Sequence, residues 1–168
     1  ESLESLAKVL KDNPAYAIQL IGHSSHEKQG KSDQQFALKR AQLVRRELIK
    51  QGVAPHQLRV KSDGSNNPVY YLPTKDWQQY YNRRVEVKWL DPELMPFEIV
   101  AEQTWTEEKA LQNVEEWERK GKQAYYERYL HNHKPIYRVK LWGYKTYKEA
   151  KNSAEELSNK YRASFTVD

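Results

Sequence analysis

The chain has 168 residues, of which 38% are hydrophobic and 30% are charged. This length and composition allow one ordinary core or two small ones, and they exclude a disordered tail. No apolar stretch approaches the roughly 20 residues that a membrane-spanning helix needs, and the absence of cysteine excludes disulfides and thiolate chemistry. A net charge of +5 favours an anionic partner, such as nucleic acid, anionic lipid or a carboxylate-bearing peptide.

The first half of the chain is predicted to begin with a helix, a strand and a second, longer helix. Apolar residues at helical spacing in residues 3–10 indicate the first helix, which Pro14 ends. Residues 15–21 are typical of a buried strand, residues 22–32 of a polar loop and residues 33–51 of the long helix. The buried face of that helix is expected to carry Ala37, Ala41, Val44 and Leu48.

Two further strands are predicted in this half, separated by turn-forming residues. Leu58 and Val60 indicate a short strand, and residues 63–68 contain Asp, Gly, Asn and Pro, which favour turns. In residues 83–90, apolar and charged side chains alternate, which predicts a half-buried strand. Its buried face is expected to carry Val85, Val87 and Trp89.

Residues 91–96 are predicted to link two separate units. They include two prolines and neither Gly nor Ser, so we expect this linker to be short and stiff. The chain is therefore divided into a unit of residues 1–90 and a unit of residues 97–168.

The second unit contains an internal repeat of strand, helix and strand. Without gaps, the segment from Phe97 aligns with the segment from Tyr137, and Thr106 and Thr146 precede the two helices as N-caps. The order βαββαβ predicts a four-stranded antiparallel sheet with both helices on one face and the other face open to a ligand. The fold class expected for the whole chain is α+β.

A set of positions spread through the first unit forms a family signature: Gly22, His23, Leu38, Arg40, Ala41, Gly52, Val53, Asn82, Arg83, Arg84, Val85 and Glu86. Together they resemble the OmpA-like domain of the bacterial cell envelope. The resemblance covers residues 2–90 and implies an α/β sandwich that binds peptidoglycan. The first strand of that family has no match here, so we expect the chain to be part of a longer protein.

The OmpA-like resemblance implies a site for diaminopimelate, a zwitterionic amino acid of the wall peptide. In that family an Asp holds the amine and a helix Arg holds the carboxylate, and each such bond contributes about 1.5–3 kcal/mol. Arg40 matches the Arg, Ser25 stands at the Asp position, and Asp33 or Glu27 remains as the source of a displaced anion. The predicted peptide-binding residues are Ser25, Asp33, Arg40, Asn82 and Arg83.

In the second unit, residues 137–150 run YRVKLWGYKTYKEA and resemble the SPOR domain. Members bind glycan strands stripped of their peptides on the open sheet face, where aromatic rings and polar donors meet sugars. Arg138 matches a family position there, whereas Val100 and Ile136 stand where the family has Gln and an aromatic residue. The predicted glycan-binding residues are Gln103, Arg138, Trp142 and Tyr144, with Trp105 as a further substitute.

The two resemblances imply a non-catalytic pair of peptidoglycan-binding modules that anchors a larger envelope protein to the cell wall. The expected location is the periplasm of a Gram-negative bacterium, at the wall or outer membrane. No cofactor and no nucleic acid are expected, and a membrane is reached only through upstream parts of the parent protein. The alternative is a scaffold that docks other envelope proteins of a secretion, motility or division complex, because Ser25, Val100 and Ile136 depart from the family patterns.

Three further interpretations have less support. A wall hydrolase needs a carboxylate pair or a metal in a catalytic setting, and the glutamates at 107–108 and 115–116 are typical of solvated helix faces. His23 and His26 suggest zinc, but no cysteine or matched carboxylate completes the ligand set. An RNA-binding sheet uses an aromatic-rich strand motif that this chain lacks. For the predicted residues themselves, surface, turn and packing roles remain the alternative to binding.

Overall fold

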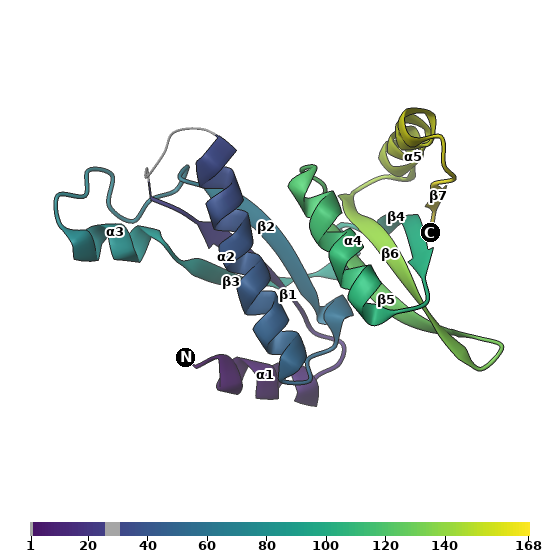
Figure 1. Cartoon of the computed structure of the whole chain (residues 1–168), viewed down its shortest axis with the longest axis horizontal. Coiled ribbons are helices and arrows are strands. Elements are labelled where there is room, and N and C mark those ends of the chain that lie inside the picture. Colours follow the sequence, from purple (N-terminus) through teal and green to yellow (C-terminus); the bar gives the residue numbers. More distant parts are fainter. Residues whose placement is uncertain (1, 26–30) are drawn as a thin grey trace. The chain divides into compact units, whose positions relative to one another are not determined.

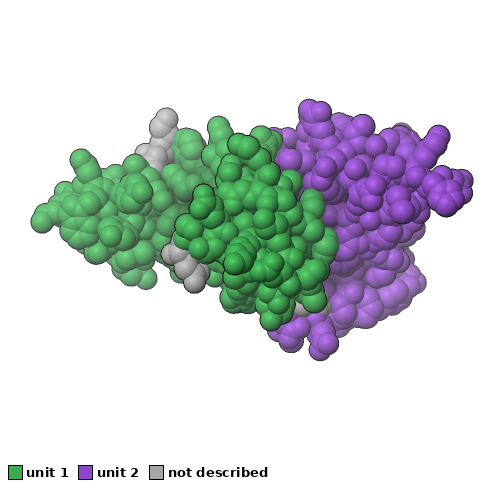
Figure 2. Space-filling model, turned by 90° about the horizontal axis from the view of Figure 1, so that it is seen from below, with its two compact units in different colours: residues 1–90 green, residues 91–168 purple. Residues whose placement is uncertain are grey.

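The computed structural model describes residues 2–25 and 31–168 (Figure 1). The chain divides into two compact units, residues 1–90 and residues 91–168 (Figure 2). Each unit has its own sheet and its own hydrophobic core. His26 and Glu27, which the sequence suggested as a zinc ligand and a displaced anion, lie outside the described residues. In the part of the chain that is described, no helix has the length and apolar character to cross a membrane.

Unit 1 is built on a three-stranded sheet with strand order β2-β1-β3. β1 runs parallel to β2 and antiparallel to β3. The carboxyl ends of β1 and β2 therefore lie at the same end of the sheet as the first residues of β3. In chain order the elements are α1 Leu3–Asp12, β1 Ala17–His23, α2 Lys31–Lys50, the 3₁₀ helix η1 Pro55–Gln57, β2 Leu58–Gly64, α3 Asp76–Asn82 and β3 Val85–Leu90.

The long helix α2 packs on β1 and β2 and forms the core of unit 1 with them. Three residues of its predicted face, Ala37, Ala41 and Leu48, are fully buried. Gly22 permits the close approach of helix and strand, since a Cβ atom there would lie 1.9 Å from the carbonyl oxygen of Ala37. The helix therefore lies directly over the end of β1, and it brings Arg40 to that end of the strand.

Of the face of β3 that its alternation predicts to be buried, only Val85 packs against the core. Val87 and Trp89 pair with Leu20 and Ile18, which are core residues, and so lie on the same face of the sheet as Val85. Val87 and Trp89 are nevertheless 44% and 53% exposed. α2 lies mainly over β1 and β2 and covers little of this edge strand (Figure 1). The alternation predicted the strand and the partial burial of Val85 correctly, but the expected burial of Val87 and Trp89 is wrong.

A short helix that the sequence analysis did not predict, α3, follows the turn-rich segment after β2. Gln78 closes its first turn, because Oε1 of that side chain accepts hydrogen bonds from the N–H groups of Thr74 and Lys75 at 2.9 and 3.1 Å. The helix has only 7 residues. Such a length is too short for an apolar periodicity to be recognised.

Unit 2 contains a four-stranded sheet of order β5-β6-β4-β7, in which all neighbouring strands are antiparallel. Residues of both helices pack into one core with one face of the sheet. Both predicted caps are confirmed, since Thr106 and Thr146 accept hydrogen bonds from backbone N–H groups of their own helices. In chain order the elements are the 3₁₀ helix η2 Pro92–Leu94, β4 Phe97–Thr104, α4 Glu107–Arg119, β5 Ala124–His131, β6 Lys134–Tyr144, α5 Tyr147–Tyr161 and β7 Thr166–Val167.

Candidate functional site

Two arginine side chains donate hydrogen bonds to residues at the carboxyl end of β1. From α2, Nη1 of Arg40 donates a hydrogen bond to the carbonyl oxygen of His23 at 2.6 Å. From the residue after α3, Nε of Arg83 donates to Oγ of Ser25 at 3.2 Å, and Nη2 donates to Oε1 of Gln79 at 3.2 Å. Three of the predicted peptide-binding residues, Ser25, Arg40 and Arg83, are therefore gathered around residues 23–25.

Backbone hydrogen bonds hold this edge of the sheet in place. The N–H of His23 donates to the carbonyl of Arg84 at 2.9 Å, and the N–H of Ser24 donates to the carbonyl of Gly64 at 2.8 Å. Segments that are far apart in the sequence thus meet beyond the ends of β1 and β2. The carboxyl ends of parallel strands are a common position for ligand sites in open sheets.

Asp33, in the first turn of α2, is buried rather than presented to solvent. Its exposed fraction is 2%, and Oδ2 accepts a hydrogen bond from Oγ of Ser65 at 3.0 Å. This bond ties the start of α2 to the loop after β2, next to the Gly64 carbonyl that holds Ser24. Asp33 therefore supports the loop at this edge of the sheet.

Asn82, which was predicted to contact the peptide, organises the loop before α3. Its buried side chain accepts a hydrogen bond from the N–H of Tyr70 at 2.9 Å and donates one to the carbonyl of the same residue at 2.8 Å. A carboxamide that is bonded on both sides acts as a positioning residue. Asn82 is the last residue of α3 and directly precedes Arg83, so its two hydrogen bonds hold Tyr70 beside the end of this helix.

Comparison with known proteins finds a family match within unit 1. The OmpA family matches residues 1–83. These residues form an OmpA-like domain. The crystal structure of the peptidoglycan-associated lipoprotein from Burkholderia pseudomallei is 28% identical, covers 52% of this chain and 74% of that chain, and gives a TM-score of 0.50.

Structures of MotB from Helicobacter pylori are also similar to the OmpA-like domain. The C-terminal domain of MotB is 30% identical over 53% of this chain and 69% of that chain, with a TM-score of 0.48. Its periplasmic domain is 29% identical over 52% of this chain and 58% of that chain, with a TM-score of 0.46. No curated protein matches the chain. The family match ends at residue 83, so the resemblance of unit 2 to the SPOR domain stays a prediction.

Within unit 1, His23 is buried between two carboxylates. Its Nδ1 lies 3.8 Å from Oδ2 of Asp63, and its Nε2 lies 3.5 Å from Oε2 of Glu86. Burial, followed by the charge of Arg84, lowers the pKa of His23 below 6.5 against the opposing influence of the two carboxylates. Among the described residues, no three or more metal-ligating side chains cluster together. Its lowered pKa leaves the imidazole of His23 neutral at pH 7.

In unit 2, the sheet face opposite the helices carries Gln103, Arg138 and Trp142. Gln103 and Arg138 are partners across β4 and β6, and the guanidinium carbon of Arg138 lies 4.4 Å from the ring centroid of Tyr129. Trp142 alternates with the core residue Leu141, but it is only 7% exposed. Of the predicted glycan-binding residues, Gln103 and the substitute Trp105 are exposed and Arg138 is partly exposed, with Tyr129 beside Arg138.

Tyr144 does not belong to this sheet face. Its hydroxyl lies 3.0 Å from Oγ of Ser153 on α5, and its ring packs against the core under the helices. Gly143 has a φ of 102°, which breaks the alternation of β6 and turns the next residue toward the helix side. Tyr144 is therefore unavailable to the predicted glycan surface.

A buried lysine at the centre of this face escaped the sequence analysis. Nζ of Lys140 lies 3.4 Å from Glu98, 3.2 Å from Glu127 and 2.5 Å from Asp168, measured to carboxylate oxygens. Burial alone lowers the pKa of Lys140, but hydrogen bonds to Asp168 and Tyr129 and the charges of both glutamates outweigh burial and raise the pKa. Its position between two core residues of β6 was the available signal, because a charge placed there needs neutralising partners.

Proposed function

We propose that the OmpA-like domain binds the peptide of peptidoglycan without catalysing a reaction, at the end of β1. The observation that carries the proposal is the meeting of Arg40 and Arg83 at residues 23–25. A guanidinium has five N–H donors in a planar fork that matches a carboxylate, and the bond to His23 uses one donor of Arg40. Two such groups at one site suit a ligand with carboxylates, such as the diaminopimelate of a wall peptide.

Ser25 makes the charge of this site differ from that of a site for a zwitterionic ligand. A hydroxyl stands where an Asp would provide a negative charge, and Oγ of Ser25 accepts a hydrogen bond from Arg83. Asp33 is buried and accepts a hydrogen bond from Ser65, so its negative charge lies beneath the loop and does not contact a ligand directly. The site therefore recognises the carboxylates of the peptide more strongly than its ammonium group.

The relatives support a proposal for the cellular setting. The matched structures include the peptidoglycan-associated lipoprotein of Burkholderia pseudomallei. By this similarity, the chain acts in the periplasm of a Gram-negative bacterium and holds a larger envelope protein to the cell wall. Contact with a membrane would come from other parts of that protein.

Unit 2 is proposed as a SPOR-like module that binds the glycan strand. The βαββαβ order, the helices on one face and the pairing of Gln103 with Arg138 on the other face support this assignment. Arg138 and the ring of Tyr129 offer a sugar both hydrogen-bond donors and an aromatic surface. The Lys140 network and the burial of Trp142 leave less open surface than the resemblance implies, which favours the scaffold as the second candidate.

Co-sedimentation with purified sacculi tests the peptide site. Arg40→Ala is expected to weaken binding about tenfold or more, because a desolvated charge-assisted bond contributes about 1.5–3 kcal/mol. Lys39→Ala removes the same charge from an exposed neighbour on α2 and should leave binding within about twofold. Equal binding by the two variants would contradict the proposal. Thermal unfolding of both variants controls for loss of the Arg40–His23 bond.

Sacculi stripped of peptides by an amidase test the glycan site. Arg138→Ala should weaken binding to stripped sacculi, whereas Lys134→Ala, an exposed change on the same strand, should not. If the chain sediments with neither form of sacculi above an unrelated basic protein, both binding proposals fail and the scaffold is favoured.

A further inference from the structure

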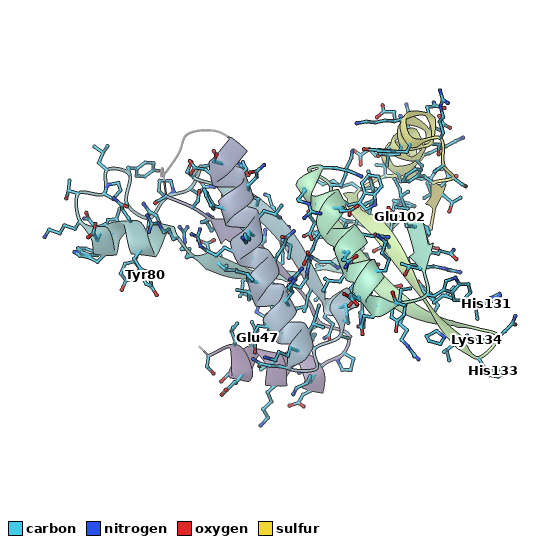
Figure 3. The ribbon with its side chains drawn as sticks, viewed as in Figure 1. Glu47, Tyr80, Glu102, His131, His133 and Lys134 are labelled. Carbon is cyan, nitrogen blue, oxygen red and sulfur yellow. The ribbon has the colours of Figure 1, made fainter. Side chains whose placement is uncertain are left out.

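The segment between β2 and the end of α3 exposes a group of aromatic side chains on the OmpA-like domain. Tyr80 is 74% exposed, Tyr81 is 56% exposed and Trp77 is 49% exposed, while Tyr70 is partly exposed. These four residues are named the aromatic platform. In Figure 3, the side chain of Tyr80 points away from α3 into open space. Such a concentration of large exposed rings is characteristic of a binding surface.

The rings of the aromatic platform brace one another. The ring centroid of Tyr70 lies 5.3 Å from that of Trp77 and 6.3 Å from that of Tyr81. Tyr81 also meets Trp77 at 6.2 Å and Tyr80 at 6.3 Å. All four contacts are edge to face, an arrangement that holds the rings while a large part of Trp77, Tyr80 and Tyr81 remains open to a ligand.

The aromatic platform is continuous with the arginine site. Asn82 bonds both backbone groups of Tyr70 and directly precedes Arg83, whose guanidinium is bonded to Ser25. Gln79 lies on the same helix as three of the rings and accepts a hydrogen bond from Arg83. A long ligand bound at Ser25 and Arg83 therefore extends onto the exposed rings of α3.

Charge distinguishes among the partners that such rings could bind. In residues 64–82 the only ionised side chains are Lys75 and Asp76, which cancel. Anionic lipid surfaces and single-stranded nucleic acid need clustered Lys and Arg beside the aromatic residues. Residues 64–82 contain only Lys75, and the two arginines that follow are already bonded, Arg83 to Ser25 and Gln79 and Arg84 to Glu86. A neutral polymer with apolar ring faces and many hydroxyl groups suits tyrosine and tryptophan, which combine a flat apolar surface with a hydrogen-bonding tip.

We infer that the aromatic platform binds the sugar rings of the glycan strand from which the bound peptide extends. This inference rests on the proposed function, because it takes the ligand of the arginine site to be a wall peptide joined to its glycan. The OmpA-like domain would then recognise the junction of peptide and sugar, with the carboxylates at Arg40 and Arg83 and the sugars on α3.

Calorimetric titration of the full chain with three ligands tests this inference: a free stem peptide, the same peptide joined to its disaccharide, and a peptide-free glycan oligosaccharide. The wild type should bind the disaccharide-peptide about tenfold more tightly than the free peptide, because contacts between the sugar and the rings of Tyr80 and Tyr81 are added. Tyr80→Ala combined with Tyr81→Ala should remove this difference and leave the affinity for the free peptide unchanged.

Tyr16→Ala is the matched control, because Tyr16 is another exposed ring of unit 1 in an edge-to-face contact, here with Trp89. It should change none of the three affinities. Equal wild-type affinity for free peptide and disaccharide-peptide would overturn the inference and leave the surface to a protein partner. Equal weakening of both ligands by the double substitution would also overturn it, because the rings would then only support the peptide site.

The titrations separate failure of this inference from failure of the proposed function. If Arg40→Ala leaves the affinity for the free peptide unchanged, the arginine site is refuted. Oligosaccharide binding that is lost on removing Tyr80 and Tyr81 would still support the aromatic platform in that case. Peptide binding that depends on Arg40, with no contribution from the sugar, would refute the aromatic platform alone.

Discussion

The side chain of Asn82 completes the backbone hydrogen bonds of Tyr70, accepting from its N–H at 2.9 Å and donating to its carbonyl at 2.8 Å. Residue 70 is thus paired on both sides, although no strand runs through residues 65–75. A single buried side chain therefore holds the loop that carries one ring of the aromatic platform. The bond also couples the shape of this loop to the end of α3, next to Arg83.

Replacing Asn82 should release the loop at one identifiable amide. In Asn82→Ala, the N–H of Tyr70 loses its acceptor, and its hydrogen exchange should accelerate about tenfold or more, as expected for a lost bond of about 1.5 kcal/mol. Asn82→Asp keeps an acceptor for this N–H and should retain part of the protection. Exchange within β1 should change in neither variant. Unchanged exchange at Tyr70 in Asn82→Ala would show that Asn82 does not hold the loop.

Gln57 has a comparable role at the opposite end of the OmpA-like domain. Its buried Nε2 lies 2.9, 3.1 and 3.0 Å from the carbonyl oxygens of Leu10, Asn13 and Tyr16, which join α1 to β1. Gln57→Ala leaves these carbonyls without that donor and should lower the free energy of unfolding of unit 1 by about 1–3 kcal/mol. Urea-dependent hydrogen exchange of β1 amides measures this quantity for unit 1 alone.

Gln51→Ala provides the comparison for Gln57. Gln51 directly follows α2 and is partly exposed, and Nε2 of its side chain donates one hydrogen bond, to Oε1 of Glu47 at 3.0 Å. Its loss should change the free energy of unfolding by no more than about 0.5 kcal/mol. Similar effects of the two substitutions would mean that the three carbonyl contacts contribute little.

Local sequence patterns predicted most elements, because their physical causes lie within a few residues. Helical spacing predicted α2 and its buried alanines, and the threonine caps predicted where α4 and α5 begin. Tertiary causes were beyond such patterns. The exposure of Trp89 depends on where α2 lies, and the burial of Lys140 depends on carboxylates from β4, β5 and the end of the chain.

The candidate site was predicted only in part for the same reason. The family signature identified Arg40 and Arg83, and the structure brings both to residues 23–25. It could not reveal that Asn82 faces the backbone of Tyr70, because residue type does not show which partner a buried amide chooses. The prediction for Tyr144 was wrong because the positive φ of Gly143 interrupts the alternation of the strand. The side chain of Tyr144 therefore lies on the helix side of the sheet.

The Lys140 network makes the stability of unit 2 sensitive to acid. Burial alone raises the pKa of Glu127, but hydrogen bonding by Tyr129 and the charge of Lys140 outweigh burial and leave the pKa lowered from 4.5. A carboxyl with a lowered folded-state pKa stabilises the fold above its unfolded value, and this contribution is lost as the pH falls through the lowered pKa. The free energy of unfolding of unit 2 should therefore decline as the pH drops below about 4.5.

Glu127→Gln removes the titrating group while keeping the shape of the side chain. The variant should be less stable than the wild type at pH 7, and its stability should fall less steeply between pH values of about 5 and 3. Glu108→Gln, an exposed change on α4, should retain the wild-type pH dependence. Urea-dependent hydrogen exchange of β6 amides reports the result. If the free energy of unfolding falls equally steeply with decreasing pH in the wild type and in Glu127→Gln, Glu127 does not have this role.

His23 predicts a separate pH dependence in unit 1. Burial and Arg84 lower its pKa, while Glu86 and Asp63 act in the opposite direction without restoring the ordinary value. A histidine with a lowered folded-state pKa leaves stability unaffected above its unfolded pKa of about 6.5 and removes stability as the pH falls from there toward the folded value. The free energy of unfolding of unit 1 should therefore fall as the pH drops below about 6.5. His23→Gln should flatten this region when β1 amide exchange is followed in urea, whereas His133→Gln, at the exposed tip of the β5–β6 hairpin (Figure 3), should not. A wild-type profile that is already flat from pH 7 to 5 would show that His23 remains equally easy to protonate in the folded chain, and that Asp63 and Glu86 fully compensate for its burial.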